Sequence, residues 1–531
     1  MASGPLILAV DQGTSSTKAL LVDGRGAVVA RGSAPLTESH PRPGWVEQSP
    51  DELWESVRRA VAACVDPALA GRVAGVAFST QRESLVLWER DTGRPVRPLV
   101  SWQDQRTAAD CAELAAEGAG DLVRAVSGMP LDPMFSALKG SWLLDACDPD
   151  RRRSLAGELC LGTVDSWLLS RFGGEHVVEI GNASRTQLMD VSTGDWDERL
   201  LALFGIPRAV LPRVVPSCGP FPAARGLPPL PDGVPVLAVL GDSHAAMFAH
   251  CGWRPGVVKV TYGTGSSVMA IGTPAGTIGA PGQTLGTASQ TIGAPGRSIG
   301  TSGRTMGPGP AEAWDVGQAD GLCRSVAWDV GDGPVPAAEG NIRATGRTLI
   351  WLAELFRTTP DALLAELDAC DDDAPEGVRF VPAFGGLGAP WWEPEAQALL
   401  TGLTLGTRRT QLVAAALEAV AFQVEDVVEA VERVAGPVEV LLADGGLTRS
   451  DRMMRLQSDL SGRAVARSGE HDLSCLGAAC AAGLAAGLWT REGLEDRPRP
   501  ADTFRPAVAS DDRDARRAAW REAVGRSLPR R

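Results

Sequence analysis

Two turn segments of similar chemistry, placed in opposite halves of the chain, limit its folds more than any other feature. Residues 11–18 contain an acid, a glycine and several hydroxyl side chains, and they follow the apolar run 6–10. Residues 261–265 have similar chemistry and follow a second apolar run, 257–260. Hydroxyls and exposed backbone N–H groups at the end of a strand can hold phosphate oxygens, while a nearby carboxylate orients Mg²⁺. One such segment alone is equally typical of a hairpin turn, but two of them predict two similar halves that each bind phosphate.

The length of the chain also favours two domains. Its 531 residues exceed the size at which a single hydrophobic core stops growing. We expect an N-terminal domain over residues 1–249 and a C-terminal domain over residues 250–505. The remaining tail, residues 506–531, is rich in Arg and Ala and is compatible with a surface helix that has no chemistry of its own.

Charge and cysteine usage exclude several classes of protein. The formal net charge of −14 argues against a nucleic-acid-binding or anionic-membrane surface, although it leaves room for a local basic pocket. The ten cysteines include no CxxC pair and no zinc-like spacing, which indicates reduced thiols in a cytoplasmic protein. The apolar run before Asp11 is too short for a signal peptide. The weakly polar run 473–489 is shorter than a membrane span of about 20 residues and predicts a buried helix.

Strand-like and helical patterns alternate along both halves, which predicts an α/β fold. In the first half, strands are expected at residues 6–10, 19–23, 27–32, 73–78 and 236–240, with helices at 50–64 and 162–172. In the second half, strands are expected at residues 257–260, 266–271 and 438–442, with helices at 345–356 and 409–434.

The second half also carries a glycine-rich insertion at residues 277–310. A triplet of Thr or Ser, an apolar residue and Gly recurs in it every seven positions. This period mimics a coiled-coil heptad, but a glycine in every repeat and a single apolar residue per repeat exclude a coiled coil. We expect a duplicated, mostly disordered surface loop that is dispensable for chemistry; the alternative is a functional lid or contact loop.

Six short motifs resemble the FGGY carbohydrate kinases in their order and spacing. They are Asp11-Gln12-Gly13-Thr14, Gln81-Arg82-Glu83, Trp102-Gln103-Asp104, Gly241-Asp242, Tyr262-Gly263-Thr264-Gly265 and Asp444-Gly445-Gly446. The resemblance covers roughly residues 6–490, and the segments 182–186 and 384–392 are similar to the glycerol kinase branch of that family. It implies two actin-like (ribonuclease H-like) domains that flank a catalytic cleft, with ATP mainly on the second domain and the small acceptor mainly on the first.

The resemblance also implies a reaction: ATP with Mg²⁺ phosphorylates a primary hydroxyl of a small polyol or sugar, with glycerol favoured. Phosphoryl transfer needs a charge clamp on the phosphates, a base beside the acceptor and exclusion of water, all of which a two-domain cleft supplies. Asp242, at the end of the apolar strand 236–240, matches the family's catalytic aspartate. The alternative is that Asp242 and Ser243 only cap a helix. Asp11 and Asp242 are expected to organise Mg²⁺.

Binding residues are implied on both sides of the cleft. The acceptor is expected to contact Arg82, Glu83, Trp102, Met134, Asp242 and Ser243. An arginine fork beside a carboxylate can hold two neighbouring hydroxyls, although a surface ion pair is the alternative for Arg82 and Glu83. The nucleotide is expected to contact Gly13, Thr14, Ser15, Lys18, Gly263, Thr264, Gly346, Gly446 and Ser450.

Several positions depart from the family pattern. Met134 stands where glycerol kinases generally carry Tyr, and Ser243 stands where they carry Gln. Both changes remove hydrogen-bonding capacity, and the first creates space for a longer polyol or a ketose. On the nucleotide side, Ile350 and Ser450 replace polar amide residues. His244 either hydrogen-bonds an additional substrate hydroxyl or faces elsewhere from its helix.

Three alternatives stay open. The first is another acceptor within the same family, such as xylulose, ribulose or erythritol. The second is an actin-like or chaperone-like ATPase, against which Arg82, Glu83 and Asp242 argue, and the third is a non-catalytic regulator. As a partner we expect a small-molecule polyol or sugar, with no nucleic acid and no integral membrane segment. A homodimer or homotetramer is compatible with the sequence.

Overall fold

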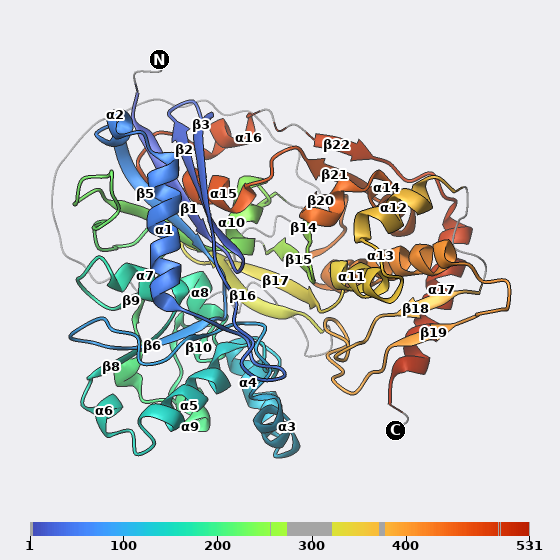
Figure 1. Cartoon of the computed structure of the whole chain (residues 1–531), viewed down its shortest axis with the longest axis horizontal. Helices are drawn as coiled ribbons and strands as arrows, with labels where there is room; N and C mark the ends of the chain where they lie inside the picture. The colour runs from blue at the N-terminus through green and yellow to red at the C-terminus, as the bar shows by residue number, and fades with distance from the viewer. Residues whose placement is uncertain are drawn as a thin grey trace, which may run out of the picture.

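The chain folds into two α/β halves, each built around its own mixed β-sheet (Figure 1). The computed structural model describes residues 4–254, 256–272, 321–370, 377–497, 499 and 501–529. The insertion 277–310 lies outside these described residues. Strands and helices alternate along both halves, which confirms the α/β class predicted from the sequence.

The two main sheets share one strand plan. The first has the order β3-β2-β1-β5-β13, from β1 (Leu6–Gln12), β2 (Ser16–Asp23), β3 (Val28–Pro35), β5 (Val73–Thr80) and β13 (Val236–Gly241). The second has the order β17-β15-β14-β20-β21, from β14 (Val257–Tyr262), β15 (Ser266–Ile271), β17 (Val335–Ile342), β20 (Val440–Asp444) and β21 (Ala464–Ser468), and it is extended by β16 (Cys323–Trp328) and β22 (Ala501–Phe504). In both orders two antiparallel pairs are followed by two parallel pairs. The two similar halves expected from the turn segments are therefore present.

A smaller sheet and a group of short helices extend the first half. The sheet has the order β4-β7-β6-β8, from β4 (Glu47–Gln48), β6 (Leu85–Glu89), β7 (Leu99–Val100) and β8 (Leu159–Thr163). The helices are α3 (Ala108–Ala116), α4 (Ala119–Ser127), α5 (Ser136–Cys147), α6 (Arg152–Leu155), α7 (Val164–Ser170), α8 (Ile180–Ser184) and α9 (Glu198–Phe204). The helix predicted at 162–172 is shorter than expected, because its first two residues pair with β6 as the end of β8.

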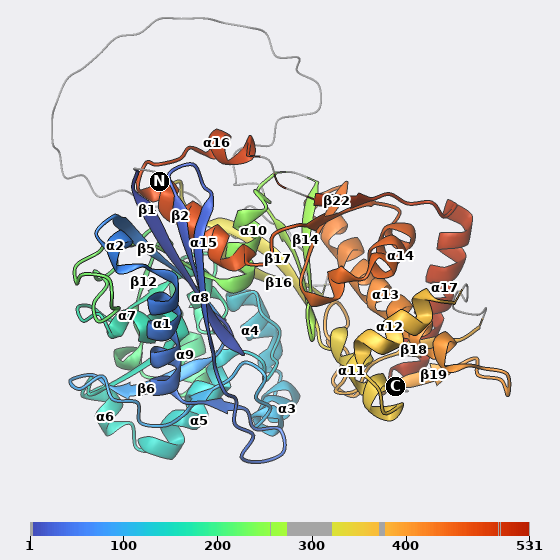
Figure 2. The ribbon, with the colours of Figure 1, turned by 45° about the horizontal axis from the view of Figure 1, so that its top comes forward.

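Two helices cover opposite faces of the first main sheet, and one of them comes from the far end of the sequence (Figure 2). On one face lies α1 (Pro50–Cys64), which starts as predicted because the Ser49 side chain accepts the Glu52 N–H and Pro50 opens the helix. On the other face lies α15 (Leu473–Ala485), which is buried as the sequence predicts. Alternate residues of β1 belong to the two different cores, so the sheet is apolar on both sides.

The second main sheet is covered by a long buried helix that also receives the C-terminal tail. The helices of this half are α11 (Gly346–Leu355), α12 (Pro360–Asp368), α13 (Arg409–Ala435), α14 (Asp451–Ser461) and α17 (Ser510–Ser527). The tail does form a helix, α17, and Trp520 of that helix stacks on Phe422 of α13 with ring centroids 5.5 Å apart. Because Trp520 and Val524 are buried, the tail belongs to the core of the second half and not merely to its surface. Across the described ranges, no helix combines the length and apolarity needed to cross a membrane.

Helix α15 also lies against α10 (Asp242–Ala249), which begins where β13 ends. A Cβ atom built on Gly477 of α15 would lie 1.7 Å from the carbonyl oxygen of Ala245. Only a residue without a side chain permits this contact between the two backbones. The position of α10, and of Asp242 at its first turn, therefore depends on a glycine far along the chain.

We expect Gly477→Ala to destabilise the protein by about 2 kcal/mol or more, because the added methyl group forces α15 away from α10. Gly525→Ala in α17 is the matched control, since nothing lies within 4 Å of the corresponding Cβ position. Because Gly525 is an exposed position of this helix, that change is expected to stabilise by about 0.5–1 kcal/mol. Denaturant unfolding of both variants measures the difference, and equal midpoints would contradict the close helix contact.

Candidate active site

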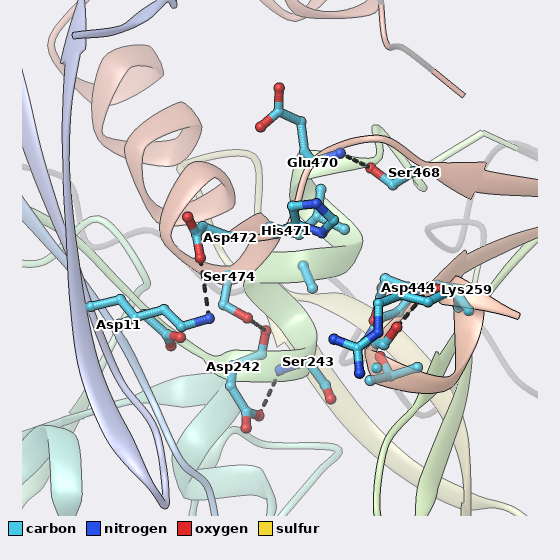
Figure 3. A pocket seen from close by; sticks show the side chains of 18 residues that line it. Asp11, Asp242, Ser243, Lys259, Asp444, Ser468, Glu470, His471, Asp472 and Ser474 are labelled. Carbon is cyan, nitrogen blue, oxygen red and sulfur yellow. Dashed lines mark hydrogen bonds and ion pairs between the residues drawn. The ribbon is translucent and has the colours of Figure 1, made fainter. Parts of the chain in front are cut away.

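A cavity of about 540 Å³ is lined by residues from both halves (Figure 3). Its volume is in the range typical of small-molecule and cofactor sites. The first half contributes Asp11, Lys18, Asp242 and Ser243, the second half contributes Lys259, Thr261, Asp444, Gly445, Gly446, Thr448 and Arg449, and residues 468–474 close one side. The cavity thus brings together five of the residues expected at the site: Asp11, Lys18, Asp242, Ser243 and Gly446.

Asp242 lies at the boundary of the cavity, at the first residue of α10. Its Oδ1 accepts the Ser243 N–H at 2.6 Å and lies 3.2 Å from Arg82 Nε. Gly241 occupies the cap position and no side-chain cap bond is formed, so the structure does not use Asp242 as the N-cap. Burial of its surroundings raises the pKa of Asp242, and the charge of Arg82 opposes that shift. With its side chain 40% exposed, Asp242 can reach a ligand in the cavity.

Asp11 faces the same cavity from the end of β1. Its Oδ1 accepts a hydrogen bond of 2.8 Å from Ser79 Oγ. Burial raises the pKa of Asp11 to about 7, and the charge of Asp242 contributes to the rise. Two carboxylates that repel each other beside a cavity fit Mg²⁺, which is usually held by one or two carboxylates together with substrate phosphates. No cluster of three metal-binding side chains occurs among the described residues, so any Mg²⁺ here needs ligands from a bound molecule.

Two lysines place positive charge at the cavity. Lys18 Nζ lies 3.1 Å from Asp472 Oδ1, and this partner raises the pKa of Lys18 although burial opposes the shift. Lys259 is fully buried on β14. Burial alone would raise the pKa of Asp444, but Lys259 and His250 hold it below its ordinary value. Cations of this kind, partly neutralised in the free protein, suit a polyanionic ligand.

The first turn segment is compact and connects to the acceptor side. Gly13 N–H donates to Ser16 O at 3.1 Å, which closes the turn between β1 and β2. Thr14 Oγ1 accepts a 3.1 Å hydrogen bond from Trp102 Nε1, and the carbonyl of Ser15 accepts from Leu36 N–H. The Trp102 ring is therefore tied directly to the turn that we expect to hold phosphate.

The second turn segment is attached to the start of α11. Gly346 N–H donates to Gly263 O at 3.0 Å, and Thr345 N–H donates to Thr264 O at 3.1 Å. A Cβ on Gly346 would lie 2.6 Å from the Gly263 carbonyl oxygen, so this approach requires glycine. Gly263, Thr264 and Gly346 are thus brought together as expected. The Ser450 hydroxyl is engaged elsewhere, since it accepts the Met453 N–H as the N-cap of α14.

On the acceptor side, Arg82 and Glu83 follow β5 and are both buried in ion pairs. They are not the exposed surface pair weighed as the alternative. Arg82 binds the carboxylate of Glu339, and Glu83 Oε1 accepts from Arg185 Nε at 2.5 Å. Glu83 has a φ of 61°, a strained conformation for a residue with a side chain. Such strain is retained where the surroundings impose it, often at functional sites.

One buried lysine, Lys139, contacts both Trp102 and Met134. Lys139 Nζ donates to the carbonyl of Met134 at 2.5 Å and to the carbonyl of Trp102 at 3.2 Å. Burial lowers the pKa of Lys139 to about 7. The Met134 side chain packs against the buried cluster of Met129, Phe135 and Cys323, so its surroundings are apolar. His244 is buried with Nε2 3.4 Å from Arg82 Nη1, which places it beside the expected acceptor residues.

Sequence reasoning missed four residues that the structure places at the site: Arg185, Lys259, Glu339 and Asp472. Arg185 and Lys259 lie within segments that the sequence analysis did single out, 182–186 and 257–260, but neither was assigned to the site. The rarity of lysine, with only three in the chain, was a signal for Lys259. Glu339 had a weaker signal, a single charge within the otherwise uncharged strand 335–342.

We expect Asp11→Asn to raise stability at neutral and alkaline pH. A pKa that rises from 3.8 to about 7 on folding means that the folded state holds the proton more tightly. The wild type therefore loses stability as the pH rises from about 4 to about 7. The variant, whose amide oxygen still accepts from Ser79, should gain on the order of 2 kcal/mol near pH 8 and almost nothing near pH 4. Unfolding midpoints at the two pH values, without nucleotide or metal, measure this; a gain independent of pH would contradict it.

Known proteins resemble this chain over its whole length. The FGGY family of carbohydrate kinases matches with its N-terminal domain over residues 6–249 and its C-terminal domain over residues 297–486. A glycerol kinase from Aromatoleum aromaticum is 38% identical and an apulose kinase from Pectobacterium atrosepticum is 36% identical, each alignment covering 98% of both chains. The solved structure of Plasmodium falciparum glycerol kinase with ADP shares 26% identity and a TM-score of 0.83 over 99% of both chains. This likeness confirms the predicted pair of actin-like domains. The chain belongs to the FGGY family of carbohydrate kinases.

Proposed function

We propose that this protein uses ATP and Mg²⁺ to phosphorylate a primary hydroxyl of glycerol or of a related small polyol or ketose. The position of Asp242 carries the proposal, because this carboxylate lines the cavity and also lies 3.2 Å from Arg82 on the acceptor side. A base at such a junction can reach a hydroxyl that faces a phosphate.

In this proposal the residues at the cavity have three roles: proton transfer, orientation of the acceptor and neutralisation of phosphate charge. Asp242 takes the proton from the attacking hydroxyl, and its raised pKa suits a group that must bind a proton during turnover. Arg82 and Glu83 orient the hydroxyls of the acceptor. Mg²⁺, when bound at Asp11 and Asp242, supplies neutralisation of the phosphate charge. Lys18 and Lys259 add positive charge on the same side.

The nucleotide side of the proposal rests on the two glycine turns. Gly13, Thr14 and Ser15 in the first turn and Gly263 and Thr264 in the second would present N–H groups and hydroxyls to the phosphates. Gly346 and Gly446 would let adenosine lie against the backbone, and Ser450 would reach it only if its capping bond opened. A relative of known structure binds ADP, which supports ATP as the donor.

Two acceptors are supported by specific observations. Relatives named glycerol kinase support glycerol. A relative of similar identity named apulose kinase supports a branched ketose, and Met134 in apolar surroundings supports an acceptor with more carbon atoms than glycerol. A protein–ligand contact at a single pocket position discriminates by about 10–200-fold, so one residue such as Met134 can redirect the preference.

We expect Asp242→Asn to lower kcat by about 10²–10⁴-fold, because the amide cannot accept the hydroxyl proton, and to leave nucleotide binding without Mg²⁺ unchanged. The measurement is acceptor-dependent ADP release, with nucleotide affinity measured separately. Asp426→Asn is the matched control, since Asp426 is a buried carboxylate of α13 that contacts Trp520. Retention of more than about a tenth of the activity by Asp242→Asn would exclude a base at this position.

The acceptor is identified by a panel of glycerol, erythritol, xylulose, ribulose and apulose, assayed by ADP release with Asp242→Asn as the blank. We expect Met134→Tyr to shift the preference toward glycerol by roughly tenfold, because a phenol hydroxyl both fills space and binds a hydroxyl. A wild-type preference for glycerol of more than about a hundredfold would show that Met134 and Ser243 do not redirect specificity. ADP release that is the same with and without any acceptor would instead support an ATPase.

A further inference from the structure

Strand β17 of the second half presents a row of polar side chains to the acceptor residues of the first half. Glu339, Asn341 and Arg343 alternate along this strand and its end, so they point to the same side. We call them the β17 polar row. Each member is bonded to a residue of the first half, although the row belongs to the sheet that carries the second phosphate turn.

Glu339 is the innermost member of this row and is fully buried. Its two oxygens accept from Arg82 Nη1 and Nη2, both at 2.8 Å. Arg185 Nη1 lies 3.1 Å from Oε2, and Ser267 Oγ donates to Oε1 at 2.7 Å. Burial alone would raise the pKa of Glu339, but Arg185 and Arg82 hold it well below its ordinary range. Glu339 is therefore an ionised carboxylate in contact with two arginines of the other half.

These contacts determine where Arg82 can point. One terminal nitrogen donates to Glu339 and faces His244, and the other donates to Glu339 as well. The Nε lies 3.2 Å from Asp242. A guanidinium has five N–H groups. Two of those of Arg82 donate to Glu339, one faces His244 and one faces Asp242, so one is left for a hydroxyl of the acceptor. A guanidinium fixed on three sides can select the direction of that hydroxyl, whereas a free arginine side chain cannot.

Five side chains form a sequence of alternating charge that crosses between the halves. In order they are Asp242, Arg82, Glu339, Arg185 and Glu83. Glu339 is the central member and the only one from the second half. Removing it would leave two buried arginines without their common partner, and like charges at this separation repel strongly in a low-dielectric environment.

The outer members of the row reinforce the contact. Asn341 Nδ2 donates to Glu339 at 3.2 Å, and its Oδ1 accepts from Arg185 at 3.2 Å. Arg343 forms an ion pair with Asp132, whose carboxylate also accepts the Met134 N–H at 2.9 Å. The row thus contacts the acceptor side at both its inner and its outer end.

We propose that Glu339 is a positioning residue of the acceptor site, which fixes Arg82 relative to Asp242 and Arg185 relative to Glu83. The inference rests on the proposed kinase function and adds that the acceptor site is completed by a carboxylate from the half that carries the second phosphate turn. Binding of the acceptor is therefore coupled to the contact between the two halves.

The test compares Glu339→Gln with Glu425→Gln in the full-length protein. Glu425 is the matched control, because it is also a buried carboxylate of the second half paired with two arginines, but its partners, Arg463 and Arg517, are not among the expected acceptor residues. We expect Glu339→Gln to lower kcat/KM for the acceptor by roughly 10²-fold, the cost typical of a misplacement of about 1 Å. The KM for ATP should change by less than about twofold. Glu425→Gln should leave both KM values unchanged.

A third variant, Glu339→Asp, keeps the charge but withdraws it by one methylene group. Its kcat/KM for the acceptor should be about tenfold higher than that of Glu339→Gln. Glu339→Asp also serves as the test if Glu339→Gln does not fold. Kinetics of Glu339→Gln that match those of Glu425→Gln, or an equal loss for ATP and acceptor, would overturn the positioning role while leaving the kinase function intact. A wild type without acceptor-dependent ADP release would overturn the proposed function and this inference with it.

Discussion

The position of the cavity residues depends on where the parallel strands of the two main sheets end. In both main sheets the first strand pairs in parallel with its neighbour, and the next pair is parallel as well. The carboxyl ends of these strands therefore lie at one edge of each sheet, and ligands of open α/β sheets bind outside such edges. Asp11, Arg82, Asp242, Thr261 and Asp444 all stand at or just after one of these ends. Because the two edges face one cavity, residues from the carboxyl ends of five strands line it: β1, β13, β14, β20 and β21.

The buried charges beside the cavity are stabilised by one another more than by water. Arg185 and Glu339 have no exposed surface, and Arg82 has very little. Isolated buried ions cost several kcal/mol each, so the alternating order of acid and base is needed for the site to fold at all. Asp11 forms no ion pair with another residue of the described ranges. Its pKa is accordingly raised, chiefly by burial. The free protein thus combines paired charges at the proposed acceptor residues with a carboxylate of raised pKa at the proposed Mg²⁺ site.

How much of this could be predicted depends on the range of the interactions involved. Local patterns located β15 and α1 to the residue, and the two turn segments indicated two similar halves, because these features are determined by neighbours in sequence. Five of the residues that line the cavity were found through short motifs. The pairing of Glu339 with Arg82 had no such signal, since it joins residues 257 positions apart through the packing of two sheets. The burial of α17 was missed for the same reason, since it depends on contacts with distant residues such as Phe422 and Asp426 of α13.

The packing of α15 has a consequence for biosynthesis. One face of the first sheet, with Ile7 and Ala9 of β1, packs against residues 473–485 and against α10 in one buried cluster. N-terminal domains usually fold while the ribosome is still extending the chain. Here the cover of the first sheet is complete only after the chain has been made as far as Ala485 and has left the exit tunnel. The two halves are similar in architecture, but only the synthesis of the second allows the first to complete its core.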